Sequence, residues 1–192
     1  MLIARIIYPI QTLGPGKRLV IWTVGCKKHC KNCANPELWE QDIEKDIKVE
    51  HLAEKVNYIL KNYDVDGITI TGGDPVEQSG ELIKLLKMIR DNAGDILVYS
   101  GYTNDEIKDV LTNDEYAEFT SYIDVLIDGA YIDELNDGVS PLIGSTNQKI
   151  RYFNQYISKK YIEYLAVDRK VQNIHTDAGI ISVGIHNKNN RR

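Results

Sequence analysis

The chain has 192 residues, a formal net charge of −5, 43% hydrophobic residues and 27% charged residues. A chain of this length and composition can bury a core as one soluble domain. Its acidic balance gives no indication of a nucleic-acid-binding surface. No apolar run approaches the ~20 residues that a membrane span requires, and the first ten residues lack the layout of a signal peptide. We therefore expect a cytoplasmic protein that binds neither nucleic acid nor membrane.

Strand and helix patterns alternate over the first two thirds of the chain. The predicted strands cover 18–24, 67–71, 96–100 and 122–129. The predicted helices cover 47–62, 80–92 and a segment that begins with Thr103 and Glu106, which have the spacing of a capping box. Residues 131–149 are rich in Gly, Asn, Asp and Ser and predict a long loop. Two further candidate strands are 161–167 and 179–185.

This alternation predicts an α/β fold built from parallel strands with right-handed helical connections. No linker divides the chain, so we expect 1–192 to form a single domain. In such sheets, ligands bind where the carboxyl ends of the strands meet. The four predicted strands are each followed by a distinctive loop: the cysteine loop 25–33, "TGGDP", "YSGYT" and "LIDGAY". These four loops are predicted to lie together at one rim of the sheet.

All three cysteines of the chain lie in the stretch "GCKKHCKNC". An odd number of clustered cysteines does not fit a disulfide framework and indicates metal or redox chemistry in a reducing compartment. Their thiolates favour zinc or an iron–sulfur cluster. Zinc would need a fourth ligand, such as His29 or a distant histidine. A [4Fe–4S] cluster held by Cys26, Cys30 and Cys33 would keep one iron open to an outside ligand, and ligand counting alone leaves both metals open.

A second pattern, "TITGGDP" at 69–75, ends a predicted strand with two glycines, an acid and a proline. Taken alone, it favours a tight turn. Together with the CxxxCxxC spacing that follows the preceding strand, it resembles the radical S-adenosylmethionine (SAM) superfamily. The resemblance implies a partial (β/α) barrel with a curved parallel sheet. It also implies that the three cysteines hold one [4Fe–4S] cluster, whose fourth iron binds the amino and carboxylate groups of SAM.

The resemblance extends to individual positions. The residues that correspond to the superfamily's "GGEP" motif, which receives the SAM amino group, are Gly72, Gly73, Asp74 and Pro75. Asp74 replaces the more frequent glutamate. The backbone around the third cysteine is expected to hold the adenine, which makes Asn32, Cys33 and Ala34 candidate contacts. Asn32 departs from the aromatic residue that many members have at this position.

Four later side chains complete the candidate cofactor-binding residues. Ser100 ends the third predicted strand, where its hydroxyl either binds SAM or only finishes the strand. Asp128 ends the fourth strand and could orient a ligand, hold a cation or cap a turn. Ser145 and Asn147, in "GSTNQ", either contact SAM or the entering substrate or satisfy a turn. The sequence does not decide among these roles.

Four segments narrow the resemblance within the superfamily. "CKNCANPELWE" resembles the activating enzymes of glycyl radical proteins, and "GYTNDEI", "DVLIDGAY" and "GSTNQKI" resemble the activating proteins of anaerobic ribonucleoside-triphosphate reductase. The similar part covers about 15–151 and leaves the role of 152–192 undefined. This resemblance implies an oxidoreductase that cleaves SAM reductively, so that a 5′-deoxyadenosyl radical removes a hydrogen atom from a glycine of the large reductase subunit. The implied electron donor is a flavodoxin- or ferredoxin-like protein.

Three alternatives stay open on the sequence. The chain could activate a different glycyl radical enzyme, or act on a small molecule such as a pterin within the same superfamily. It could also be a zinc-bound interaction module without catalytic activity. In the expected activase no side chain need act as a general acid or base, because the cluster and SAM carry the chemistry.

Overall fold

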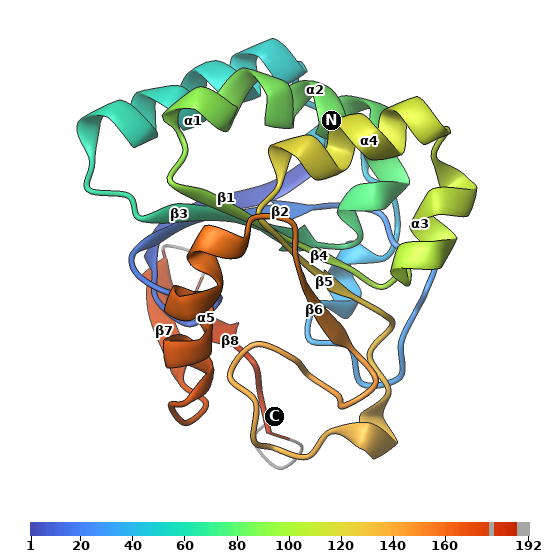
Figure 1. Ribbon diagram of the computed structural model, residues 1–192, viewed down its shortest axis with the longest axis vertical. Coiled ribbons are helices and arrows are strands. Elements are labelled where there is room, and N and C mark those ends of the chain that lie inside the picture. The colour runs from blue at the N-terminus through green and yellow to red at the C-terminus, as the bar shows by residue number, and fades with distance from the viewer. Residues whose placement is uncertain (177–178, 188–192) are drawn as a thin grey trace.

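Six strands form one sheet, in sequence order, in the computed structural model, which describes residues 1–176 and 179–187 (Figure 1). The strands are β1 (Ile3–Ile10), β2 (Arg18–Thr23), β3 (Gly67–Gly72), β4 (Asp95–Ser100), β5 (Val125–Asp128) and β6 (Lys149–Tyr152). Strands β2 to β5 are parallel, and β1 and β6 pair antiparallel at the two edges. The fold is therefore α/β with a parallel centre, as the sequence predicts.

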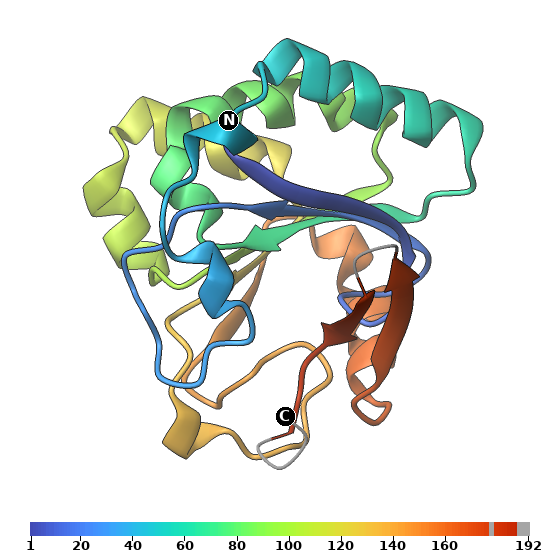
Figure 2. The same cartoon turned by 180° about the vertical axis from the view of Figure 1, so that it is seen from behind.

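Four helices cover one face of the sheet (Figures 1 and 2). They are α1 (Val49–Asn62), α2 (Ser79–Ile89), α3 (Asn104–Val110) and α4 (Asn113–Tyr122). Alternate residues of β2, such as Leu19 and Ile21, pack against these helices and are fully buried. Because the central strands are covered on both faces, they are apolar along nearly their whole length.

The opposite face is covered by the last part of the chain. Helix α5 (Ser158–Leu165) and a two-stranded antiparallel sheet of β7 (Val171–Thr176) and β8 (Gly179–Gly184) lie there (Figures 1 and 2). Tyr161 of α5 is fully buried against β4 and β5, and Val183 of β8 packs against Val20 and Trp22. Elements α5 and β8, which lie beyond residue 151, thus contribute to the folded core.

The short elements that remain are 3-10 turns. They are Pro36–Leu38, Ile43–Lys45, Pro75–Gln78, Arg90–Asn92, Asp133–Leu135 and Gln155–Ile157. The predicted capping box of Thr103 and Glu106 is confirmed, with reciprocal side-chain-to-backbone hydrogen bonds at the start of α3. No helix within the described ranges is both long and apolar enough to cross a membrane.

One predicted strand is wrong, and three strands were not expected. Residues 161–167 mostly form the end of α5, because Ile157, Tyr161 and Leu165 recur at a spacing of four and pack together against β4 and β5. The predicted strand at 122–129 is shorter than expected, since α4 continues to Tyr122. Strand β8 confirms the prediction for 179–185. Strands β1 and β6 are mostly half-buried and β7 is mostly exposed, so none of the three has a clear strand signal in the sequence.

Candidate functional site

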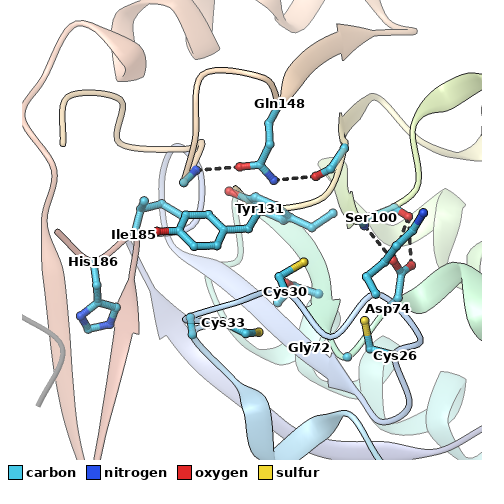
Figure 3. A pocket seen from close by; sticks show the side chains of 18 of the residues that line it. Cys26, Cys30, Cys33, Gly72, Asp74, Ser100, Tyr131, Gln148, Ile185 and His186 are labelled. Atoms are coloured by element: carbon cyan, nitrogen blue, oxygen red, sulfur yellow. Dashed lines mark hydrogen bonds between the residues drawn. The ribbon is translucent and has the colours of Figure 1, made fainter. Parts of the chain in front are cut away.

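One pocket collects the loops that follow β2, β3, β4 and β5, which confirms the predicted convergence at one rim (Figure 3). Its empty space, counted together with the open mouth, is about 830 Å³. All three cysteines line it, together with residues from the ends of the parallel strands. The pocket therefore lies where ligands bind in parallel α/β sheets.

The cysteine loop is shaped by its own backbone. The N–H of Gly25 donates to Leu38 O at 2.9 Å, and the N–H of Cys26 donates to Trp39 O at 2.9 Å. The left-handed backbone of His29, with φ of 45°, and of Asn32, with φ of 56°, turns the loop twice between the cysteines. These turns place three free, partly exposed thiols around one pocket.

Three lysines of the cysteine loop form ion pairs with glutamates of three other elements. Lys27 pairs with Glu77 at 2.7 Å, Lys28 with Glu106 at 2.9 Å, and Lys31 with Glu134 at 3.0 Å. The Lys28 ammonium also lies 4.0 Å from the centre of the Tyr102 ring. Each lysine has an acidic partner, so these residues act on the loop as anchors rather than as unpaired positive charges.

Burial raises the pKa of the Cys26 and Cys30 thiols above the ordinary value, and neighbouring backbone N–H groups oppose this effect only in part. Without a bound metal these two cysteines are therefore neutral thiols at pH 7. Metal binding requires thiolates, so loading of the site must release protons. The protonation state of the loop thus favours metal uptake at higher pH.

A zinc site completed by His29 is not formed. The His29 ring stacks on Trp39, with ring centres 4.8 Å apart, and lines a second surface cleft, which Cys26 also lines. Across 1–176 and 179–187, no three His, Cys, Asp or Glu side chains are grouped as ligands of a single metal ion. In a [4Fe–4S] cluster each of the three thiolates would bind a different iron.

Gly72, the last residue of β3, and Gly73, the residue after it, allow this strand end to lie directly against the cysteine loop. A Cβ atom on Gly73 would overlap the carbonyl oxygen of Gly25, and the N–H of Asp74 donates to the same oxygen at 2.7 Å. Gly72 has a φ of 116°, which side-chain-bearing residues rarely adopt. The "GGDP" turn thus joins the two motifs into one unit and exposes glycine backbone to the pocket.

Asp74 holds the ends of β3 and β4 together. Its carboxylate accepts hydrogen bonds from Gly101 N at 2.7 Å, Ser100 Oγ at 2.9 Å and Val76 N at 3.0 Å, and the residue is 1% exposed. Burial raises its pKa to about 6, against the opposing effect of these donors. The Ser100 hydroxyl donates to Asp74, although both residues line the pocket.

The candidate residues divide into two groups by location. Those that line the pocket with Cys26 and Cys30 are Cys33, Ala34, Gly72, Gly73, Asp74 and Ser100. The residues outside the lining are Asn32, Pro75, Asp128, Ser145 and Asn147. Pro75 is buried at the start of a 3-10 turn, and Asn32 Nδ2 donates to Asp133 at 3.0 Å.

The side chains of the second group bond within the protein. Asp128 accepts from Asn104 N at 2.8 Å and from Arg151 Nε at 2.9 Å. Ser145 Oγ accepts from Ile132 N at 3.1 Å. Asn147 Nδ2 donates to Ala130 O at 2.8 Å, but its buried Oδ1 has no hydrogen-bond partner among the described residues. Asn147 is thus the candidate whose polar atoms are incompletely satisfied.

Sequence reasoning missed several residues that line the pocket, including Tyr131, Gln148, Ile185 and His186 (Figure 3). Gln148 braces the wall, since its Nε2 donates to Gly129 O at 2.9 Å and its Oε1 accepts from Gly144 N at 2.8 Å. Tyr131 follows the fourth predicted strand directly and could have been found from the rim rule. Ile185 and His186 carried no such signal, because they come from the far end of the chain.

Known proteins match most of the chain. The 4Fe-4S single cluster domain family matches residues 12–151. An anaerobic ribonucleoside-triphosphate reductase-activating protein of Enterobacteria phage T4 is 32% identical over 151 residues, which cover 75% of this chain and 90% of that protein. Proteins of the same name are 31% identical over 153 residues in Vibrio cholerae and 29% identical over 154 residues in Escherichia coli K12. Both matches cover 76% of this chain and 95% of the relative.

The residues matched by the family model contain the cysteine loop and the rim of β2 to β5, which form most of the pocket. The arrangement of three cysteines around that pocket agrees with a domain that holds one iron–sulfur cluster. On this combination of sequence similarity and site geometry, the chain belongs to the family of anaerobic ribonucleoside-triphosphate reductase-activating proteins.

Proposed function

We propose that the chain generates a glycyl radical on the large subunit of an anaerobic ribonucleoside-triphosphate reductase by reductive cleavage of SAM. The observation that carries this proposal is a set of three cysteines around one pocket, in a chain with no fourth cysteine. A [4Fe–4S] cluster held there would have one iron free to bind SAM. The proposal includes a partial (β/α) barrel of the radical SAM type.

The residues present fit this cofactor set. Cys26, Cys30 and Cys33 would hold the cluster, and the glycine backbone at Gly72 and Gly73 would lie beside SAM in the same pocket. Bound there, the cluster would supply the electron for reductive cleavage of SAM. A reduced flavodoxin- or ferredoxin-like protein, in the cytoplasm, is the proposed source of that electron.

The proposed task of the chain's own residues is to bind and orient the cofactors and to shield the reacting atoms from water. Asp74 fixes the glycine turn against β4, and Lys28 fixes the cysteine loop against Tyr102 and Glu106. The glycine of the partner would give up one hydrogen atom to C5′ of the deoxyadenosyl group, where it would form a C–H bond, and the unpaired electron would stay on the glycine. Because a hydrogen atom rather than a proton moves, the pocket needs no general base, and its main task is to hold the reacting atoms close together.

Of the candidates that lie outside the pocket lining, Asn147 has the strongest case for contact with SAM or the partner. Its Oδ1 is buried and has no hydrogen-bond partner within 1–176 and 179–187. Because buried polar atoms are normally paired, a bound N–H or O–H group is expected to complete it. Ser100, Asp128 and Ser145 would act through the backbone that they hold. The backbone of Asn32, Cys33 and Ala34 remains the proposed adenine contact.

Anaerobic reconstitution tests the proposal. Wild-type protein should bind about four irons per chain and release 5′-deoxyadenosine when dithionite and SAM are added. Cys30→Ser should lose both properties, because it removes one of the three ligands. Wild-type protein that binds the iron but does not cleave SAM would contradict the proposal.

A further inference from the structure

The family match ends at residue 151, although the described chain continues through α5, β7 and β8 to residue 187. Three quarters of this chain suffice to cover 90% to 95% of the relatives' own length. The described residues from 152 on, called here the C-terminal addition, lie outside the family match. They pack on the sheet through Tyr161 and Val183, which are 0% and 3% exposed.

The end of this addition enters the pocket. Gly184 has a φ of 141°, and a Cβ atom there would overlap the carbonyl oxygen of Lys170, so the chain can turn away from β8 only at a glycine. The next two residues, Ile185 and His186, then line the pocket that holds the three cysteines. Figure 3 shows them on the other side of the cysteines from Asp74 and Ser100.

Arg169 fastens this end segment to the loop before β6. Its side chain is 4% exposed. Nε donates to Ser140 O at 2.6 Å, and Nη2 donates to Ile143 O at 2.9 Å. Nη1 donates to Asn136 Oδ1 at 2.8 Å and to His186 O at 3.4 Å. One buried guanidinium thus joins the family-matched loop to the added segment.

We propose that Ile185 and His186 form a wall that contacts the glycine-bearing segment of the partner, and that Arg169 is a positioning residue for this wall. The inference rests on the proposed function, because it assigns a substrate contact in the same pocket. An apolar side chain beside an imidazole can exclude water from the reacting atoms and bond to a peptide backbone. The C-terminal addition thereby selects the partner polypeptide that is activated.

The experiment measures how tightly SAM cleavage is coupled to radical formation when the full-length, reconstituted protein acts on the large reductase subunit. Two quantities are recorded, namely the glycyl radical formed per 5′-deoxyadenosine released and the KM for the reductase subunit. In Ile185→Asp and His186→Ala the yield of radical per deoxyadenosine should fall about tenfold, because a small displacement of the substrate weakens hydrogen transfer strongly. The KM should rise by a similar factor.

Ile180→Asp is the matched control, because Ile180 is 64% exposed on the same hairpin and does not line the pocket. It should couple as the wild type does. Arg169→Ala should reproduce the coupling defect, and Arg169→Lys should restore part of it by keeping one charged donor. Iron content is measured in every variant, so that a misfolded protein is recognised.

Two failures are distinguishable. If Ile185→Asp and His186→Ala both kept the wild-type radical yield per deoxyadenosine and the wild-type KM, the proposed wall would be wrong. SAM cleavage and the proposed function would be unaffected by that result. Absence of SAM cleavage in the iron-loaded wild type would overturn the proposed function and this inference with it. A defect in Ile180→Asp as large as that in Ile185→Asp would also contradict the wall, since the effect would then belong to the hairpin as a whole.

Discussion

The ion pair between Arg18 of β2 and Asp95 of β4 is buried beside α5. Asp95→Asn is therefore expected to destabilise the protein strongly. The two side chains are 0% and 3% exposed, and Arg18 Nη2 lies 2.9 Å from Asp95 Oδ2. The same carboxylate accepts from Tyr161 Oη at 2.6 Å and from Lys160 Nζ at 2.9 Å, so it ties α5 to β4. Removal of its charge leaves a buried guanidinium without a counter-charge.

The expected loss follows from this burial. Breaking a buried pair by removing one partner costs about 3–5 kcal/mol, which corresponds to a fall in Tm of about 6–20 °C for a chain of this size. Lys160→Met removes another partner of the same carboxylate. Because the Lys160 side chain is 40% exposed, its loss should lower the free energy of unfolding by less than about 1 kcal/mol. Thermal unfolding followed by circular dichroism measures both shifts.

The difference in stability between wild type and Asp95→Asn should depend on pH, and the direction of this dependence follows from the pKa of Asp95. Burial alone would raise the pKa of Asp95, but Arg18, Tyr161 and Lys160 outweigh burial and hold the pKa below its ordinary value. The stability that Asp95 contributes is therefore complete above pH ~4 and is lost as the pH falls through the lower, folded-state pKa. The Tm difference between wild type and Asp95→Asn should shrink below pH ~4. A difference of under about 1 kcal/mol at pH 7 would refute the reasoning.

Three further outcomes are expected. Gly73→Ala should lower SAM cleavage by more than about tenfold, because the new Cβ would displace the cysteine loop; full activity would contradict the close approach. Thr103→Ala should cost about 1 kcal/mol through loss of a capping box, while SAM cleavage per iron is retained; a loss of cleavage would show that α3 positions the site. His29→Ala should keep its iron, since this ring stacks on Trp39, and loss of the metal would favour a histidine ligand.

The central strands were predictable because each is a short apolar run bounded by Gly, Asp or Ser. A strand that is covered on both faces can be recognised without any contact information. The edge strand β1 is half-buried along most of its length, so its pattern lacks that signal. Helix α5 was mistaken for a strand because "YIEYLAV" contains residues that favour strands, and only its packing at every fourth residue reveals the helix.

The residues of the candidate site likewise divide into those that the sequence pattern predicts and those that depend on contacts between distant segments. Residues at the carboxyl ends of β2 to β5 were predictable, since parallel topology gathers them at one rim. The internal hydrogen bonds of Asp74 were not, because they depend on the spacing between β3 and β4. Ile185 and His186 could not be found either, because they reach the pocket through a turn at Gly184 at the end of a separate hairpin.

The most direct measurement for the central claim is the electron paramagnetic resonance spectrum of the reductase subunit after incubation with reconstituted protein, dithionite and SAM under anaerobic conditions. The account predicts the doublet of a glycyl radical, which grows with the release of 5′-deoxyadenosine and is absent with Cys30→Ser. Efficient SAM cleavage without any doublet would contradict the claim that this chain activates such a subunit.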